Sequence, residues 1–214
     1  GAAAGQEGEE GEPARLLRLG REQIDAQGLP PGEFLPFWAS FERFVPRYLD
    51  WLAATETEGQ RYAAGEQDRS VTPFAEPELT GLRLRGRIDR IDHFDAQGQA
   101  RMLIDYKTGG LTGLKAKIAN PLEDTQLAVY AALVAGEAEQ LTAQYLALDD
   151  SRGIAGVEHP QVQRSAALLI EGVGRDLQAA HAGAPLPALG EGQVCTFCEM
   201  RGLCRRDDWA EPAL

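Results

Sequence analysis

Two stretches in the middle of the chain alternate between apolar and polar residues, which is the pattern of a β-strand with one buried face. The first covers residues 82–89. Its apolar row is Leu82, Leu84, Gly86 and Ile88, and its polar row is Arg83, Arg85, Arg87 and Asp89. The pattern therefore predicts a strand that carries Asp89 on its polar face, on the other side from Ile88.

The second stretch covers residues 102–107 and places Asp105 and Lys107 on one face of a strand. The other face consists of Met102, Ile104 and Tyr106, and Leu103 is the apolar start of the Asp105 row. Residues 95–98 between the two stretches contain the Asp and Gly of a hairpin turn, so the strands are expected to be antiparallel neighbours. This pairing predicts that Asp89, Asp105 and Lys107 lie in one neighbourhood.

The rest of the chain alternates between helical and extended patterns. Helices are predicted over residues 14–27, 34–57, 122–133 and 163–180, and further strands over residues 70–75 and 140–148. Residues 61–68 are expected to be a connector, and Gly109, Gly110 and Gly113 a mobile loop. This order of elements indicates an α/β protein with a mixed sheet flanked by helices.

Four segments are expected from these patterns and from composition. Residues 1–13 are an acidic flexible linker, residues 14–68 a helical segment that packs on the core, residues 69–190 the core, and residues 191–214 a cysteine-containing tail. A chain of 214 residues is long enough to bury a substantial core in one domain.

Charge and hydropathy exclude some classes of protein. The net charge of -12 argues against nucleic-acid binding by overall charge, but residues 79–130 carry 8 basic and 6 acidic side chains. The basic residues there that are placed to meet phosphates are Arg83, Arg85, Arg87, Arg90, Lys115 and Lys117. No apolar run approaches the roughly 20 residues of a membrane span, and the N-terminus lacks the features of a signal peptide. We therefore expect no membrane association and a cytoplasmic location.

The two aspartates and the lysine suggest chemistry at a divalent cation. Oxygen ligands from Asp89 and Asp105, with a backbone carbonyl, suit Mg²⁺ or Mn²⁺ better than zinc. A lysine beside them is placed to align a water or to neutralise charge on a phosphate. The plainer alternative is that a D-x-K strand pattern is only a solvated face.

The sequences GRID at residues 86–89 and LIDYKTG at residues 103–109 resemble the PD-(D/E)XK nuclease superfamily, and within it the RecB and AddB type of nuclease domain. The resemblance implies a three-layer α/β/α core like that of restriction endonucleases. It implies that Asp89, Asp105 and the Tyr106 carbonyl hold Mg²⁺ or Mn²⁺ and that Lys107 is the catalytic lysine.

A second part of the resemblance lies in the helix predicted over residues 122–133. Gln126 and Tyr130 are four residues apart and share a helix face. RecB-like nucleases have a Q-x-x-x-Y pair that faces the active site and DNA on the helix after the catalytic strand. The alternative is that Tyr130 is an ordinary core residue.

All the cysteines of the chain, Cys195, Cys198 and Cys204, lie close together in the tail. Clustered thiols in a cytosolic protein indicate metal ligation rather than disulfides. Four thiolates complete a [4Fe-4S] cluster or a zinc site, and this chain offers three. The spacing resembles the C-terminal triplet of AddB-type nucleases, which implies an iron–sulfur cluster in preference to zinc. Three small buried cysteines are the alternative.

In such nucleases the fourth cysteine and a further metal-ligand motif precede the core, and neither is present in this sequence. We therefore expect this chain to be the C-terminal part of a longer protein that acts in DNA double-strand-break repair or recombination, with a helicase subunit or a helicase-like region as partner. The expected function is a metal-dependent DNA nuclease of the RecB/AddB exonuclease type. The alternatives are a nuclease that is inactive as the isolated chain for lack of the first motif, a catalytically inactive DNA-binding module and a protein-interaction module on the same fold.

Overall fold

The computed structural model describes residues 10–28, 31–185, 195 and 198–204 of the chain. Its centre is a five-stranded mixed sheet with the strand order β1-β2-β3-β4-β5. The strands are β1 (Arg61–Val71), β2 (Leu84–His93), β3 (Ala100–Lys107), β4 (Gln140–Ala147) and β5 (Ala155–Glu158). Only β3 and β4 are parallel; the other neighbours are antiparallel.

The helices lie before, between and after the strands. The α-helices are α1 (Glu12–Ala26), α2 (Leu35–Thr57), α3 (Leu111–Ile118), α4 (Thr125–Leu133), α5 (Val162–His181) and α6 (Arg201–Cys204). Two 3₁₀ turns, η1 (Pro31–Phe34) and η2 (Pro77–Leu79), precede α2 and β2. None of the described helices is long and apolar enough to cross a bilayer.

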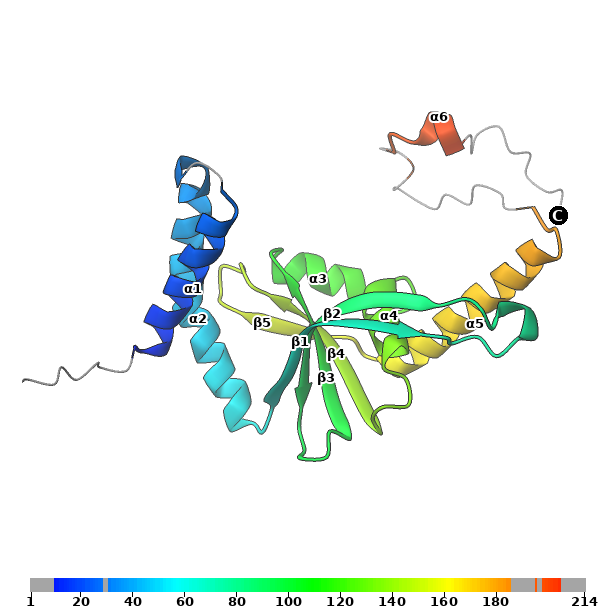
Figure 1. The fold of residues 1–214 in the computed structure, drawn as a ribbon, viewed down its shortest axis with the longest axis horizontal. Helices are drawn as coiled ribbons and strands as arrows, with labels where there is room; N and C mark the ends of the chain where they lie inside the picture. The colour runs from blue at the N-terminus through cyan, green and yellow to red at the C-terminus, as the bar shows by residue number, and fades with distance from the viewer. Residues whose placement is uncertain (1–9, 29–30, 186–194, 196–197, 205–214) are drawn as a thin grey trace, which may run out of the picture.

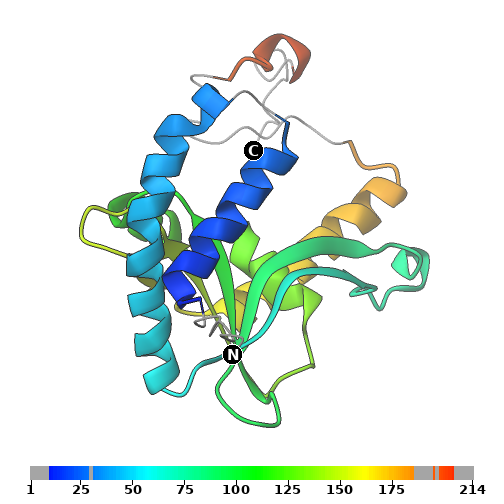
Figure 2. The same ribbon diagram turned by 60° about the vertical axis from the view of Figure 1, so that its left-hand side comes forward.

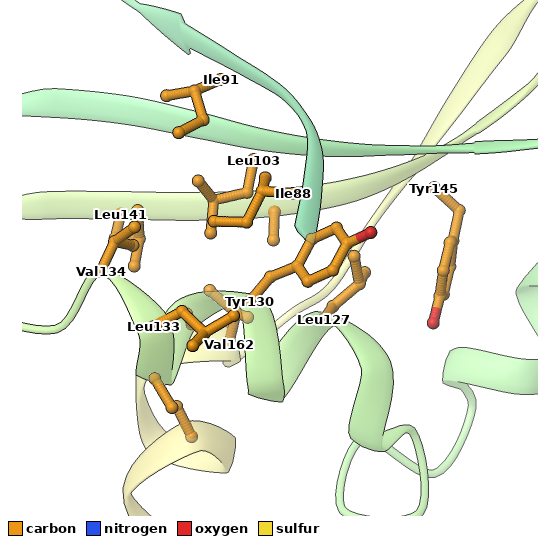
Figure 3. Packing of buried hydrophobic residues seen from close by; sticks show 14 of the residues in the cluster. Ile88, Ile91, Leu103, Leu127, Tyr130, Leu133, Val134, Leu141, Tyr145 and Val162 are labelled. Carbon is orange, nitrogen blue, oxygen red and sulfur yellow. The ribbon is translucent and has the colours of Figure 1, made fainter. Parts of the chain in front are cut away.

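Both faces of the sheet are covered, which gives the predicted three layers. On one face a large apolar cluster joins the sheet to α3, α4 and α5, with Leu103 and Leu127 completely buried (Figure 3). On the other face Met102, Ile104 and Leu146 form a smaller cluster against Trp51 of α2. The predicted α/β class and the mixed sheet flanked by helices are therefore confirmed.

The first two helices form a hairpin at one end of the molecule. In both views α1 lies alongside α2 (Figures 1 and 2). A Cβ atom at Gly20 would lie only 2.3 Å from Phe41 of α2, so the close approach of the helices needs a glycine there. The aromatic stripe of α2 continues from Phe41 through Phe44 and Tyr48 to Trp51 as a series of stacked rings that reaches the sheet.

The β1–β2 pair extends beyond the rest of the sheet as a two-stranded ribbon (Figure 1). The two strands pair as far as Val71 and Leu84, whereas β3 pairs with β2 only from Arg90 onward. The expectation of a connector over residues 61–68 was wrong, because these residues form most of β1. Their polar composition is compatible with a strand because β1 is an edge strand whose side chains are largely exposed.

The structure differs from the predictions in three other segments. The loop expected through Gly113 is the helix α3, because Leu111 and Leu114 are buried and the Leu111 N–H donates to Asp150 Oδ2 at 2.9 Å. The backbone N–H groups of Leu111 and Arg152 lower the pKa of Asp150 to about 2.

The linker predicted over residues 1–13 lies largely outside the described residues, although α1 already begins at Glu12. The short strand β5 was not predicted.

Candidate active site

The centre of the candidate site is the point where β2 leaves the ribbon and joins β3. Ile88 belongs to the apolar cluster on the α4 side, and the neighbouring Asp89 also bonds to α4, so strict alternation fails at this point. The Asp89 carboxylate accepts the backbone N–H of Tyr106 at 3.1 Å. Asp89 is therefore attached to the end of β3, beside Asp105.

Asp105 is the most buried member of the group, with only 1 % of its surface exposed. Its Oδ1 atom accepts a short hydrogen bond from the Gln126 side-chain amide. Lys107 Nζ lies 2.6 Å from Asp105 Oδ2, and the lysine side chain is 28 % exposed. Among the described residues, Oδ2 has no partner with the geometry of a directed hydrogen bond, so the ammonium group is its only close counterpart.

Tyr130 links the two carboxylates. Its hydroxyl oxygen lies 3.0 Å from Asp89 Oδ1 and 3.2 Å from Asp105 Oδ1. One O–H group donates to one acceptor at a time, so it is shared between the two aspartates. In Figure 3 the hydroxyl points away from the aliphatic cluster, toward the side where Tyr145 lies. The structure brings Asp89, Asp105 and Lys107 together, and the side chains of Gln126 and Tyr130 contact the carboxylates.

Burial sets the protonation behaviour of the site. Burial raises the pKa of Asp105, and Asp89 adds to the increase, whereas Lys107 and Tyr130 oppose it. Burial also raises the pKa of Tyr130, and the negative charge of the two aspartates raises it further. The tyrosine therefore stays protonated and acts as a hydrogen-bond donor, and Asp105 keeps its proton to a higher pH than an exposed aspartate does.

The local sequence explains how α4 presents two polar groups to the site. Leu127, Ala131 and Leu133 are buried in the apolar cluster and fix the helix against the sheet. Gln126 and Tyr130 lie on the part of the helix that faces the ends of β2 and β3, because residues four apart share a face.

A network next to the site was not predicted from the sequence. Lys117 of α3 donates to the Tyr145 hydroxyl at 2.7 Å, and this hydroxyl donates to Asp124 Oδ1 at 2.6 Å. In the sequence, Tyr145 lies in the strand predicted over residues 140–148 and has the pattern of a core residue. Nothing in the sequence indicated this network, because it depends on the parallel pairing of β3 and β4, which places Tyr145 beside Asp105 in the register of the structure.

The basic residues proposed to meet phosphates differ in their surroundings. The prediction that Arg90 is placed to meet phosphates was wrong. Arg90 is 3 % exposed and pairs with the buried Asp92 at 2.7 Å on the α2 side of the sheet. Arg87 forms a two-pronged ion pair with Asp68, and Arg83 donates to Ser70. Burial makes Arg90 a structural residue and removes it from the phosphate-binding candidates.

The donor set of the site fits a small divalent cation. Asp89 and Asp105 bring carboxylate oxygens together, and Asp105 Oδ2 is buried with the Lys107 ammonium group 2.6 Å away. Mg²⁺ is typically held by one or two carboxylates and keeps several waters, so it does not need a larger protein cage. No group of three or more His, Cys, Asp and Glu side chains is placed to hold a metal ion among these residues.

The cysteines of the tail do not form a metal site in the described structure. Cys195 is half-buried, and Cys198 and Cys204 are exposed. Together they supply three thiols, which do not complete a four-thiolate site, and they are not gathered into a metal-binding group in the part of the tail that is described. Most of the predicted tail, residues 191–214, lies outside the described residues.

Comparison with known proteins gives a family and a relative to which this chain is similar. The family model of the PD-(D/E)XK nuclease superfamily matches residues 3–205. One subunit of an ATP-dependent helicase/deoxyribonuclease from Carboxydothermus hydrogenoformans is 30% identical over 115 residues, which is 53% of this chain. The aligned part is 9% of that protein, so the chain corresponds to a small portion of this relative's length.

Proposed function

This chain belongs to the PD-(D/E)XK nuclease superfamily, and from that membership we propose that it is a Mg²⁺- or Mn²⁺-dependent deoxyribonuclease of the RecB/AddB type. The choice of DNA as substrate rests on the relative, whose name contains deoxyribonuclease. The observation that carries the proposal is the meeting of Asp89, Asp105 and Lys107 at the junction of β2 and β3.

In this proposal Asp89, Asp105 and the backbone carbonyl of Tyr106 hold the divalent cation. When bound, the cation supplies Lewis-acid activation of a water and neutralises charge on the phosphate. Lys107 orients the attacking water, whose oxygen forms a bond to phosphorus while a P–O ester bond of the DNA breaks and the leaving oxygen takes up a proton. The ammonium group is anchored for this task by its contact with Asp105 Oδ2.

Gln126 and Tyr130 are proposed to keep the two carboxylates in place and to position the DNA strand. Each donates a hydrogen bond to Asp105 in the described structure, which limits the rotation of that carboxylate. The preorganised donors stay protonated, since the pKa of Tyr130 is raised by burial. Both side chains project from α4, which is fixed in the core.

The wider role is proposed from the relative. Its name describes a helicase/deoxyribonuclease, which supports a helicase subunit or helicase-like region as partner and an exonuclease role in DNA double-strand-break repair. The three tail cysteines remain a predicted partial ligand set for a [4Fe-4S] cluster. Iron, sulfide and zinc analysis of the purified protein tests this part, and a protein without any of them contradicts it.

The nuclease proposal is tested with end-labelled linear DNA in Mg²⁺ or Mn²⁺. We expect cleavage by the wild-type chain and a loss of at least about 100-fold in Lys107→Ala, because one electrostatic group in an active site typically contributes that much. Arg43→Ala is the control, since Arg43 is an exposed residue of α2 on the opposite side of the sheet and contacts Ser40. Full activity in Lys107→Ala contradicts the proposal. DNA binding without cleavage by the wild-type protein favours the inactive DNA-binding module instead.

A further inference from the structure

A second lysine lies beside the carboxylates, and it is held from two directions. Lys117 projects from α3, and its side chain is 40% exposed. Its ammonium group donates to the Tyr145 hydroxyl at 2.7 Å and lies 4.3 Å from the centre of the same ring. Leu111 and Leu114, three residues apart on the buried face of α3, continue to Lys117 with the same spacing. The helix therefore aims this lysine at the sheet rather than at bulk water.

The groups that hold Lys117 are themselves fixed. Tyr145 has no exposed surface and lies next to Asp105 in the β3–β4 register. Asp124 is 2% exposed and accepts the Tyr145 hydroxyl at 2.6 Å. Asp124 stands at the N-cap of α4, where an aspartate normally accepts a backbone N–H of the first turn, but its side chain makes no such cap bond. Its carboxylate is instead directed to Tyr145 and Lys117, which lies 3.7 Å away.

This network touches the proposed catalytic site at two points. Gln126 Oε1 lies 3.4 Å from Lys117 Nζ, while the amide nitrogen of Gln126 donates to Asp105. Lys107 Nζ lies 5.3 Å from the centre of the Tyr145 ring, so the ammonium groups of Lys107 and Lys117 both lie over one tyrosine. Two cationic groups thus accompany the carboxylates of Asp89, Asp105 and Asp124.

Lys117 lies near the buried carboxylate of Asp124 and still reaches solvent. The two partners of this ion pair differ in exposure, since the Lys117 side chain is 40% exposed and the Asp124 side chain 1%. Asp124 already has a close donor in the Tyr145 hydroxyl, so it does not need the lysine to satisfy Oδ1. The network fixes the solvent-accessible ammonium group of Lys117 at a place where one side chain, Gln126, separates it from Asp105.

We propose that Lys117 is a second substrate-binding cation of the active site, which contacts a phosphate of the bound DNA strand, and that Tyr145 and Asp124 are positioning residues that hold it there. This inference rests on the proposed nuclease function. It extends that function by assigning a residue that binds the DNA backbone next to the phosphate at which cleavage occurs.

The first test compares Lys117→Gln with the wild-type chain and with Arg43→Gln, which removes one positive charge on the opposite side of the sheet. DNA binding is measured in EDTA at salt concentrations from about 50 to 200 mM, and kcat and KM are measured in Mg²⁺. We expect Lys117→Gln to raise Kd and KM about tenfold near 0.1 M salt and to reduce the slope of log Kd against log salt by about one, as loss of a single phosphate contact does. Lys117→Arg keeps the charge and should restore most of the binding.

The positioning role is tested with a double-mutant cycle. Tyr145→Phe removes the hydroxyl that accepts from Lys117, so it should weaken DNA binding in the wild-type background and have little further effect in Lys117→Gln. Fully additive losses overturn the positioning role. Urea denaturation of each variant confirms that the proteins compared are folded.

The outcomes also separate this inference from the function on which it rests. Wild-type cleavage that is lost in Lys107→Ala but unchanged in Lys117→Gln, with the same Kd and salt slope as Arg43→Gln, overturns the inference alone. Absence of cleavage by the wild-type chain contradicts the proposed function. If Lys117→Gln then has the same salt slope as the wild-type chain, the proposed contact of Lys117 with a phosphate is contradicted as well.

Discussion

Strands β2 and β3 carry a buried aspartate on each face of the sheet, and the two have opposite surroundings. Asp92 faces α2, and both of its oxygens are bonded: Oδ1 accepts from Arg90 at 2.7 Å and Oδ2 from Gln60 at 2.6 Å. Asp105 faces α4, and its Oδ2 has only the Lys107 ammonium beside it within the described residues. Both carboxylates have close partners, but the charges around Asp105 are incompletely paired, because two carboxylates, Asp89 and Asp105, meet there and Lys107 is the ammonium group in contact.

The difference extends to the neighbours of each aspartate. Arg90 also donates to Tyr48 of α2 at 2.7 Å, which completes a network in which one buried cation meets one buried anion. On the other face two carboxylates share one tyrosine hydroxyl, so negative charge is in excess. Burial of a charge is therefore not the mark of a functional site here. The mark is a buried charge whose pairing is incomplete, because this leaves a role for a cation.

The largest expected effect is the loss of cleavage when the incompletely paired aspartate is neutralised. Asp105→Asn should reduce the rate of DNA cleavage by at least about 10³-fold, since it removes a ligand of the proposed cation and the partner of Lys107. Its free energy of unfolding should change by no more than about 1 kcal/mol, because the charge that is costly to bury disappears. Cleavage assays and urea denaturation of the same preparations measure both quantities.

The matched substitution on the other face should have the reverse outcome. Asp92→Asn leaves the Arg90 guanidinium buried without an anion, which typically costs about 3–5 kcal/mol of unfolding free energy. At a temperature where the variant is folded, its cleavage rate should stay close to that of the wild-type chain. If Asp92→Asn loses cleavage while it remains folded, or if Asp105→Asn keeps it, the contrast between the two faces is wrong.

The sequence predicted the face of the sheet that carries Asp105 better than the face that carries Asp92. The alternation of residues 102–107 and the hairpin at residues 95–98 predicted that Asp105 and Lys107 lie near Asp89, as the structure has them, although the predicted separation of Asp89 from Ile88 was wrong. The facing of Gln126 and Tyr130 was expected from the family resemblance, and both side chains contact Asp105. These relations depend on local periodicity and on one tight turn. They are short-range features that a sequence expresses directly.

The remaining features depend on contacts between distant segments. Arg90 looked like its neighbours Arg85 and Arg87, and only the docking of α2 onto the sheet buries it against Asp92 and Tyr48. Residues 61–68 looked like a connector because an edge strand pairs with one neighbour and exposes most of its side chains. The link from Lys117 to Tyr145 joins residues 28 apart in the chain, so no local pattern announced it.

The raised pKa of Asp105 predicts a pH dependence of both cleavage and stability. Because the pKa of Asp105 is raised by burial, it stays protonated above the ordinary aspartate range near pH 4. Cleavage should therefore fall about tenfold per pH unit below this raised pKa, as the ligand for the cation is lost. In the metal-free protein the native state binds the extra proton, so the free energy of unfolding should decrease as pH rises through this interval. Asp105→Asn should remove that decrease, whereas a slope that persists in this variant assigns the effect to another group.

The smallest expected effect comes from removing a single hydroxyl on each face. Tyr48→Phe removes one hydrogen-bond acceptor of Arg90, which keeps its bond to Asp92. The free energy of unfolding should therefore decrease by about 1–2 kcal/mol, and the rate of cleavage should be unchanged. Tyr130→Phe takes away the donor that Asp89 and Asp105 share, so the two carboxylates repel each other more strongly and the cleavage rate should fall about tenfold or more. The two variants lose the same atom from helices on opposite sides of one sheet. The distinction between Asp92 and Asp105 does not hold if both variants are less stable but fully active, or if both are less active but equally stable.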